Sequence, residues 1–308
     1  MKKVFIDGSA GTTGLRIKER LSQRKDIQLL SLTEELRKDN DARKQIINSA
    51  DIVFLCLPDD AAREAVAMID NPNTCVIDTS TAHRTAEGWT YGFPEIGNRK
   101  ASIASSKRIA NPGCHASGFI ALVAPLVEAG ILSKDLDLTC FSLTGYSGGG
   151  KKMIAQYEEE GRDVLLDAPR MYGLTQGHKH LPEMSVICDL DKKPVFCPIV
   201  APFYAGMEVV VPILKGMTKA SIEDIKKAYA SYYTGKLVKY VDSADEAGFI
   251  SAGALAGRDD MLVTVCGNED RILLVSLFDN LGKGASGAAI QNMNLILGVD
   301  ETEGLNIG

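Results

Sequence analysis

The segment Asn111–His115 reads Asn-Pro-Gly-Cys-His and places a cysteine directly in front of a long apolar run. That run, residues 116–129, has the composition of a buried helix and ends at Gly130. A thiol at a helix N-terminus faces unpaired backbone N–H groups and the positive end of the helix dipole, and both lower its pKa. Cys114 is therefore expected to act as a nucleophile. A small buried hydrophobic residue is the alternative for any cysteine.

A second polar cluster, the run His178-Lys179-His180-Leu181-Pro182-Glu183, contains two of the four histidines of the chain. A thiol that forms covalent intermediates needs a proton carrier with a pKa near neutrality, which imidazole supplies. We expect His180 to carry the proton, with His178 as the alternative, and Glu183 to orient the imidazole or bind substrate. No metal is expected, because no other ligand cluster accompanies the two histidines and Pro182 breaks a helical frame.

Glycines near the N-terminus have the spacing of a phosphate-binding turn. They follow an apolar strand and open a helix, in the pattern G-x-x-G-x-x-G rather than the commoner G-x-G-x-x-G. Glycine lets the backbone approach a pyrophosphate, and the helix N-terminus supplies N–H donors. A purely structural glycine turn is the alternative. The residues expected to bind the dinucleotide are Gly8, Ser9, Ala10, Gly11, Thr12, Thr13 and Gly14.

The end of the second predicted strand is expected to contact the adenosine ribose. An acidic residue there favours NAD, whereas small polar or basic residues leave room for the 2′-phosphate of NADP. Ser31 ends this strand and Arg37 follows, so NADP is favoured; Glu34 and Glu35 are interpreted as a solvated helix start. Pro58, after the third strand, is expected on the nicotinamide side, with an ordinary turn as the alternative.

Two polar loops are expected to hold anionic groups. In the loop after the fourth strand, Ser80 is expected to contact the cofactor and Arg84 to clamp a substrate carboxylate. The loop Ser147–Lys152 has three glycines before two lysines, so Ser147, Lys151 and the backbone amides are expected to hold a second anion. Solvated loops with surface charges are the alternative for both.

The elements that must position these groups alternate in type in the first third of the chain. Strands separated by helices of this length predict βαβ units and a parallel sheet, hence a Rossmann domain in an α/β protein. Short strand-like pieces are predicted at Ser102–Ser105 and Arg108–Ala110. The predicted strands are Lys3–Asp7, Ile27–Leu32, Asp51–Leu57 and Thr74–Asp78, and the predicted helices are Thr13–Gln23, Asp41–Asn48 and Asp60–Ile69.

After Gly130 the pattern becomes β-rich and predicts a second, α+β domain with a mixed or antiparallel sheet. It includes one helix at Ser221–Tyr233, for which Ser221 is a good N-cap, and the chain closes with a helical pattern at Ala285–Leu297. The sharpest change in composition lies at residues 111–113. The predicted strands are Leu136–Thr144, Pro194–Pro202, Met207–Leu214, Met261–Val265 and Ile272–Phe278.

Composition excludes several classes of protein. With 308 residues, 45% hydrophobic and 24% charged, the chain has the make-up of a two-domain soluble protein. A net charge of −6 argues against nucleic-acid or anionic-membrane partners, and neither a signal peptide nor a membrane-spanning run is recognised. The number of cysteines is seven, which is odd, and no C-x-x-C occurs, so neither a disulfide framework nor a zinc site is indicated. This usage is typical of a reducing compartment, and a cytoplasmic location is expected.

Taken together, four segments resemble the N-acetyl-gamma-glutamyl-phosphate reductases in their shorter bacterial form. They are the glycine-rich start, the Asn-Pro-Gly-Cys turn, the His-Lys-His-Leu-Pro-Glu run and the closing segment Asp279–Asn294. Phe93-Pro94-Glu95 and the Ser147–Lys152 loop also fit the pattern. One departure is His115, where the longer form of the family usually has an aromatic residue.

The resemblance implies a Rossmann domain of residues 1–112 and 285–308, completed by the C-terminal helix, with a catalytic and dimerisation domain of residues 113–284 inserted between. It implies a semialdehyde dehydrogenase-like fold, the third step of arginine biosynthesis, NADP as cofactor, and a homodimer or homotetramer. It also adds Asn280 to the expected cofactor-binding residues and Asn111 to the substrate-binding ones.

The reaction expected is reduction of an acyl phosphate, with release of inorganic phosphate. The Cys114 thiolate would attack the acyl carbon to form a thioester, which accepts hydride far better than a carboxylate does. Three alternatives remain open: the same chemistry on aspartyl phosphate, a non-catalytic dinucleotide sensor, and a Cys-His hydrolase. The last leaves the glycine loop unexplained. A substrate linked to a carrier protein also stays open.

Overall fold

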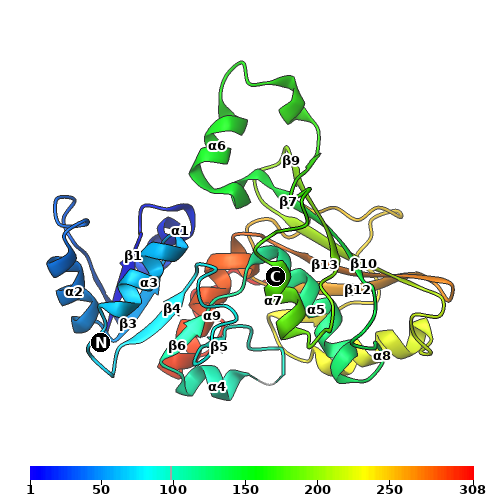
Figure 1. Cartoon of the computed structure of the whole chain (residues 1–308), viewed down its shortest axis with the longest axis horizontal. Helices are drawn as coiled ribbons and strands as arrows, with labels where there is room; N and C mark the ends of the chain where they lie inside the picture. The colour runs from blue at the N-terminus through cyan, green and yellow to red at the C-terminus, as the bar shows by residue number, and fades with distance from the viewer. Residues whose placement is uncertain (98) are drawn as a thin grey trace. The chain divides into compact units, whose positions relative to one another are not determined.

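The computed structural model describes residues 1–97 and 99–308, and the chain divides into two compact units. The first unit comprises Met1–Pro94, Arg99–Pro112 and Ala285–Leu305. The second is mainly Gly113–Gly284, joined by Asn306–Gly308 and a short segment that begins at Glu95. The first unit is therefore built from both ends of the polypeptide, as the colours of Figure 1 show.

The first unit contains a six-stranded parallel sheet in the order β2-β1-β3-β4-β6-β5. The strands expected between residues 3 and 78 and the helices between them are all present, with ends that differ by at most two residues. Its strands are β1 (Lys2–Asp7), β2 (Ile27–Leu30), β3 (Ile52–Leu55), β4 (Cys75–Asp78), β5 (Thr90–Tyr91) and β6 (Arg108–Ala110). Its helices are α1 (Thr12–Leu21), α2 (Asn40–Ser49), α3 (Asp59–Ala67), α4 (Lys100–Ser105) and α9 (Gly287–Leu297).

The strand order has a switch point beside β1. The chain places β2 on one side of β1 and β3 on the other, so the winding direction reverses there. Ligands of open α/β sheets bind outside the carboxyl ends of the strands at such a point. Here that end is Asp7, followed directly by Gly8.

One prediction in this unit was wrong: Ser102–Ser105 belongs to helix α4 and is not a strand. Only Ile103 of this helix is buried, and the Ser105 hydroxyl donates to the carbonyl of Ala101 at 3.0 Å. A single apolar residue among small polar ones gives no usable periodicity, so a short helix and a short strand look alike in the sequence.

The second unit contains a seven-stranded mixed sheet in the order β11-β12-β13-β10-β7-β9-β8. Figure 1 labels five of these strands, β7, β9, β10, β12 and β13. The pairs β11–β12 and β7–β9 are parallel, whereas the others are antiparallel. Its strands are β7 (Thr139–Gly145), β8 (Arg170–Met171), β9 (Val195–Ala201), β10 (Met207–Leu214), β11 (Val238–Tyr240), β12 (Met261–Asn268) and β13 (Arg271–Phe278). Its α-helices are α5 (Cys114–Glu128), α6 (Gly150–Glu158), α7 (Leu181–Ile187) and α8 (Ile222–Tyr232).

Helix α5 packs closely on this sheet. At Gly118 an added Cβ would lie 2.4 Å from Cγ2 of Val209 in β10, so only glycine allows this approach. Side chains along β10 alternate between buried and partly exposed. Val209 belongs to the buried set that faces α5, and the sheet face opposite α5 is partly accessible. On that other face Phe141 and Leu273 remain 42% and 40% exposed.

Two further predictions need correction. Pro182 does not prevent a helix, because it lies in the first turn of α7, where its missing N–H would have no intrahelical partner. The closing helix begins at Gly287 rather than Ala285, after a π-helical turn over Gly282–Ser286. In the part of the chain that the structure describes, no helix has the length and apolar character that crossing a membrane requires.

Candidate active site

Cys114 is the first residue of α5 and follows Gly113, the extended N-cap residue with φ −82° and ψ 145°. The backbone N–H of Gly113 donates to the carboxylate of Glu183 in α7 at 2.7 Å. Glu183 is buried, and no acidic residue lies in the first turn of α5. The carboxylate expected to orient an imidazole or bind substrate thus anchors the turn that carries the nucleophile.

The π-helical turn Gly282–Ser286 packs against Cys114. At Gly284 an added Cβ would lie 2.9 Å from Cβ of Cys114 and 3.1 Å from the carbonyl oxygen of Asp279. The carboxylate of Asp279 accepts the N–H groups of Leu281 and Gly282 at 2.6 and 3.0 Å, which fixes the start of the turn. The glycine of the closing motif is therefore required by its contact with the cysteine.

Three of the four histidines lie in one cluster with Tyr172. The ring of His115 lies 5.5 Å from that of His180, 5.9 Å from that of His178 and 6.0 Å from that of Tyr172. The two predicted proton carriers, His178 and His180, are 4.8 Å apart between ring centres. The backbone N–H of His180 donates to Nδ1 of His178 at 3.2 Å, so neutral His178 carries its hydrogen on Nε2.

Burial sets the protonation of this cluster. It lowers the pKa of His115 to about 3, and the charge of His178 adds to this effect. It also lowers the pKa of His178, with Lys179 contributing in the same direction. Burial raises the pKa of the Tyr172 phenol, and negative charge on Cys114 raises it further. At neutral pH His115 is therefore neutral and Tyr172 keeps its proton.

In the second unit, Asn280, which was predicted to bind the cofactor, contacts Ser147, which was predicted to bind a substrate anion. The side-chain amide of Asn280 donates to the hydroxyl of Ser147 at 3.0 Å, and its carbonyl accepts the N–H of Gly206 at 2.9 Å. Asn280 and Ser147 are both buried, whereas Lys151 is exposed in the first turn of α6. The Asn280–Ser147 contact shapes the loop from which Lys151 projects.

The first unit holds the glycine-rich loop at the end of β1. Gly8 has φ +84°, and an added Cβ would meet the carbonyl oxygen of Cys56 at 2.2 Å. At Gly14 an added Cβ would meet the carbonyl oxygen of Gly8 at 2.4 Å. Both glycines are therefore required for the backbone to turn from β1 into α1.

A cavity of about 880 Å³ opens beside this loop. It is lined by Gly8, Ser9, Ala10, Ser31 and Arg37, all predicted cofactor residues. Three further basic side chains line it that the sequence did not single out: Lys18, Lys38 and Arg43. Arg43 forms a buried ion pair with Asp7 at 2.8 Å. Arg37, one of the predicted residues, pairs with the exposed Glu34.

The loop fits a dinucleotide phosphate. The Oγ1 atom of Thr12, at the first turn of α1, is buried and has no hydrogen-bond partner within the residues that the structure describes. The first turn of α1 contains no acidic residue. A buried hydroxyl without a partner next to a helix N-terminus and two close-packed glycines suits an incoming anion. Gly11, Thr13 and Gly14 belong to the same strand-to-helix turn, with Gly11 at its N-cap.

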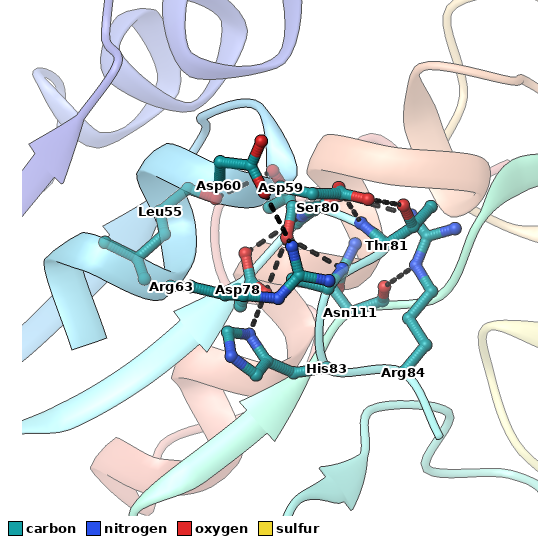
Figure 2. Close-up of polar contacts among 12 residues, drawn as sticks. Leu55, Asp59, Asp60, Arg63, Asp78, Ser80, Thr81, His83, Arg84 and Asn111 are labelled. Carbon is teal, nitrogen blue, oxygen red and sulfur yellow. Dashed lines mark hydrogen bonds and ion pairs between the residues drawn. The ribbon is translucent and has the colours of Figure 1, made fainter. Parts of the chain in front are cut away.

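At the carboxyl end of β4, the buried carboxylate of Asp78 accepts three hydrogen bonds. Figure 2 shows Ser80 and His83 directed at it. The N–H of Ser80 donates at 2.9 Å and its hydroxyl at 2.7 Å, and Nδ1 of His83 lies 2.7 Å away. The His83 ring stacks on Trp89 with a centroid distance of 4.1 Å. Ser80, which was predicted to contact the cofactor, thus donates its hydroxyl hydrogen to Asp78.

Arg84 lies in the same loop and contacts the backbone (Figure 2). Its Nε donates to the carbonyl of Asn111 at 3.0 Å, and one terminal nitrogen donates to the carbonyl of Thr79 at 3.1 Å. The side-chain amide of Asn111 donates in turn to the carbonyl of Ala285 at 3.0 Å. Pro58 is the N-cap residue of α3 and lies next to Leu57, which lines the cavity.

Sequence reasoning missed the contribution of Tyr172, Ser142 and His115. Nδ1 of His115 lies 2.6 Å from the Ser142 hydroxyl, and Nε2 lies 2.6 Å from that of Tyr172. The only available signal was the unusual histidine next to Cys114. Among the described residues, no group of three or more His, Cys, Asp or Glu side chains is arranged to hold a metal ion.

Comparison with known proteins places both units in one family. Residues 9–104 match the family described as semialdehyde dehydrogenase, NAD binding domain, and residues 114–280 match semialdehyde dehydrogenase, dimerisation domain. The chain is 44% identical to N-acetyl-gamma-glutamyl-phosphate reductase 2 of Nostoc sp., over 98% of this chain and 99% of that protein. It is 47% identical to N-acetyl-gamma-glutamyl-phosphate reductase of Chelativorans sp., over 96% and 98%.

Solved structures share the fold at lower identity. Aspartate semialdehyde dehydrogenase II from Vibrio cholerae, complexed with ASA, has a TM-score of 0.72 and 18% identity, covering 96% of this chain and 98% of that one. Aspartate semialdehyde dehydrogenase with NADP from Candida albicans has a TM-score of 0.68 and 16% identity, with the same coverage. At this identity the likeness concerns the fold alone, and it confirms the α/β architecture expected from the sequence.

Proposed function

Because the chain belongs to the N-acetyl-gamma-glutamyl-phosphate reductases of the semialdehyde dehydrogenase family, we propose that it reduces N-acetyl-L-glutamyl 5-phosphate to the 5-semialdehyde and phosphate. This is an oxidoreductase reaction of arginine biosynthesis. The observation that carries the assignment on this chain is the placement of Cys114 as the first residue of α5, in the unit that also holds the cluster of His115, His178 and His180.

NADP is the cofactor. The loop Gly8–Gly14 would receive its pyrophosphate, and Ser31, Arg37 and Lys38 line the cavity where a 2′-phosphate would be held. When bound, NADPH supplies the hydride that reduces the acyl carbon. Two observations support this placement. Gly8 and Gly14 have no room for a side chain, and the buried Thr12 hydroxyl has no hydrogen-bond partner among the described residues.

The chain's own groups perform the covalent steps. The Cys114 thiolate attacks the acyl carbon, a C–S bond forms, and the bond from that carbon to the phosphate oxygen breaks. An imidazole of His180 or His178 holds the thiol proton and returns one as the thiohemiacetal collapses, which frees Cys114. His178 has a lowered pKa and, when neutral, carries its hydrogen on Nε2. Its free lone pair is on Nδ1, which already accepts the His180 N–H, so His178 could accept a proton only by giving up this bond or by changing tautomer. This favours His180 as the carrier.

The sites for the substrate's anionic groups remain part of the proposal. Lys151, exposed in the first turn of α6, suits the phosphate. Arg84 and Asn111 are proposed to act on the carboxylate through the atoms that do not bond the backbone. Within the second unit, Ser147 is held by the side-chain amide of Asn280, and Glu183 accepts the backbone N–H of Gly113.

The decisive measurement is phosphate-dependent reduction of NADP or NAD with two aldehydes, N-acetyl-L-glutamate 5-semialdehyde and aspartate semialdehyde. The proposal expects turnover with the first and NADP, and loss of turnover in Cys114→Ala. Preference for aspartate semialdehyde would overturn the substrate assignment. Binding of NADP without turnover of either aldehyde, and without rapid alkylation of Cys114, would favour a sensor protein.

The assembly is an oligomer whose contact surface we propose to be the open face of the seven-stranded sheet. Phe141, Leu273 and Leu214 are exposed there, and Phe141 is paired across β10 and β9 with Val210 and Cys197. A second copy of the same face would cover these apolar side chains. A cytoplasmic location agrees with this biosynthetic role and is likewise proposed.

A further inference from the structure

His115 forms a short hydrogen-bonded chain with two hydroxyl groups. Its Nδ1 lies 2.6 Å from Oγ of Ser142 in β7, and its Nε2 lies 2.6 Å from the phenol oxygen of Tyr172. His115 is 3% exposed and Ser142 is fully buried. Because burial keeps His115 neutral, one ring nitrogen carries a hydrogen and the other accepts one.

Ser142 decides which nitrogen that is. Across the described residues, its hydroxyl has a single hydrogen-bond partner, Nδ1 of His115. If Nδ1 carried the hydrogen, the hydroxyl hydrogen of Ser142 would be buried without an acceptor, at a cost of about 1–3 kcal/mol. Ser142 therefore donates to Nδ1, and the hydrogen of His115 is on Nε2.

The same assignment determines the direction of the Tyr172 hydroxyl. Nε2–H of His115 donates to the phenol oxygen, so the phenol hydrogen must point away from the imidazole. In residues 1–97 and 99–308, the phenol oxygen has no other hydrogen-bond partner. Tyr172 is only partly buried, and negative charge on Cys114 raises the pKa of its phenol. A hydroxyl that accepts a hydrogen bond also becomes a stronger donor.

We propose that Ser142 and His115 are positioning residues that turn the hydroxyl hydrogen of Tyr172 toward the space beside Cys114, where it donates to the oxygen that becomes negatively charged during the reaction. A donor held in this direction before the reaction stabilises the charged state without reorganisation. The last step rests on the proposed function, whereas the hydrogen positions do not.

The tautomer is tested directly on the wild-type protein labelled with ¹⁵N-histidine. The proposal expects Nδ1 of His115 to show the ¹⁵N shift of an unprotonated nitrogen and Nε2 that of a protonated one at pH 7. His178, whose Nδ1 accepts the His180 N–H, supplies an internal reference for the same tautomer. Ser142→Ala identifies the His115 signals by perturbing them. A protonated Nδ1 on His115 would overturn the proposal, whether or not the proposed substrate is turned over.

The catalytic part is tested by a double-mutant cycle on kcat. Tyr172→Phe is expected to lower kcat roughly 100-fold, as loss of one oxyanion donor does. Ser142→Ala and His115→Phe are expected to lower it roughly tenfold with little change in KM, and His115→Gln, which keeps an N–H donor, to restore most of the loss. In the Tyr172→Phe background, Ser142→Ala should have no further effect. Losses that add independently would show that Ser142 does not act through Tyr172.

Discussion

At Gly284 the heavy atom nearest to an added Cβ would be the Cβ of Cys114, 2.9 Å away, and the next the carbonyl oxygen of Asp279. Gly284→Ala must therefore displace the nucleophile by a few tenths of an ångström. We expect kcat to fall roughly tenfold to 100-fold, because small displacements of a reacting group have effects of this size. The rate of Cys114 alkylation, measured by mass spectrometry, should fall with it.

The matched control is Gly235→Ala. No heavy atom lies within 4 Å of a Cβ added at Gly235, and its φ lies outside the left-handed region. This variant should keep the wild-type kcat and alkylation rate. Equal behaviour of the two variants would mean that the contact between Gly284 and Cys114 does not position the thiol.

His115 gives the second unit a pH-dependent stability. Its pKa is about 3 in the folded protein against 6.5 for an ordinary histidine, so the unfolded chain binds one proton more between these values. Stability from this group is complete above pH 6.5 and is lost as the pH falls. From pH 6.5 to 5 the free energy of unfolding should drop by about 2 kcal/mol.

Urea unfolding of wild type and His115→Phe at pH 7, 6 and 5 measures this effect. The variant should show a flatter pH dependence, although it is less stable at pH 7 because Ser142 and Tyr172 lose their partner. The pKa of His178 is also lowered by burial, so both proteins should keep a smaller decrease of unfolding free energy with falling pH. Parallel pH profiles would contradict the assignment.

Arg37 is expected to provide discrimination between the two nicotinamide cofactors. It lines the cavity with Ser31 and Lys38, and its ion-pair partner among the described residues is the exposed Glu34. Arg37→Ala should raise KM for NADPH roughly tenfold and leave KM for NADH unchanged, because one charged hydrogen bond to a phosphate is lost. Glu34→Gln, which keeps the arginine, is the control and should not raise KM for NADPH. Equal changes with both cofactors would place the 2′-phosphate elsewhere.

Among residues, the sequence identified those whose chemistry depends on neighbours along the chain. Gly8 and Cys114 could be singled out because a strand end and a helix start are local features. Tyr172 and Ser142 could not, since they reach His115 only through the pairing of distant strands. Arg84 was expected at the substrate carboxylate because a guanidinium is a good clamp, but nothing local shows that two of its nitrogens bond backbone carbonyls.

At the scale of elements, the end of β4 depends on the Asp78–His83 pair, and Trp89 is the only tryptophan of the chain. His83→Phe keeps a ring to stack on Trp89 but removes a donor from a buried carboxylate. We expect the free energy of unfolding to fall by about 1–3 kcal/mol, measured by urea unfolding followed through Trp89 fluorescence.

Asp78→Asn supplies the comparison for this prediction. If His83 acts through the carboxylate, adding His83→Phe to Asp78→Asn should cost clearly less than it costs in the wild type. Independent, additive losses would show that His83 does not stabilise the protein through its bond to Asp78.

Elements with strong periodicity were predictable, and short ones were not. Strands β1 to β4 are largely apolar runs separated by helices, so their type and order of appearance could be inferred, whereas the two-residue strand β5 was not predicted. Helix α4 has one buried residue and α7 has a proline as its second residue, and neither has a periodic pattern. Which strand lies beside which also could not be inferred, because the order β2-β1-β3 depends on the direction of each crossover.

At the scale of the whole molecule, the open face of the second sheet is expected to hold two copies together. Phe141→Asp combined with Leu273→Asp places charges on the two central exposed side chains of this face. The double variant should elute as a monomer in size-exclusion chromatography with light scattering, because buried unpaired charges are strongly unfavourable. Val299→Asp, at a residue 38% exposed in the first unit, is the control and should leave the oligomer intact.

The first unit is assembled from the beginning and the end of the polypeptide, and this order matters during synthesis. Its core combines Ile17, Ile52 and Ile77 with Ala289, Ile290 and Met293 of α9, all fully buried. While the ribosome is making the second unit, the parallel sheet has already emerged, yet the helix that covers part of it does not exist. A nascent chain therefore keeps an apolar surface uncovered until α9 has been synthesised, and exposed apolar surface of this kind promotes aggregation.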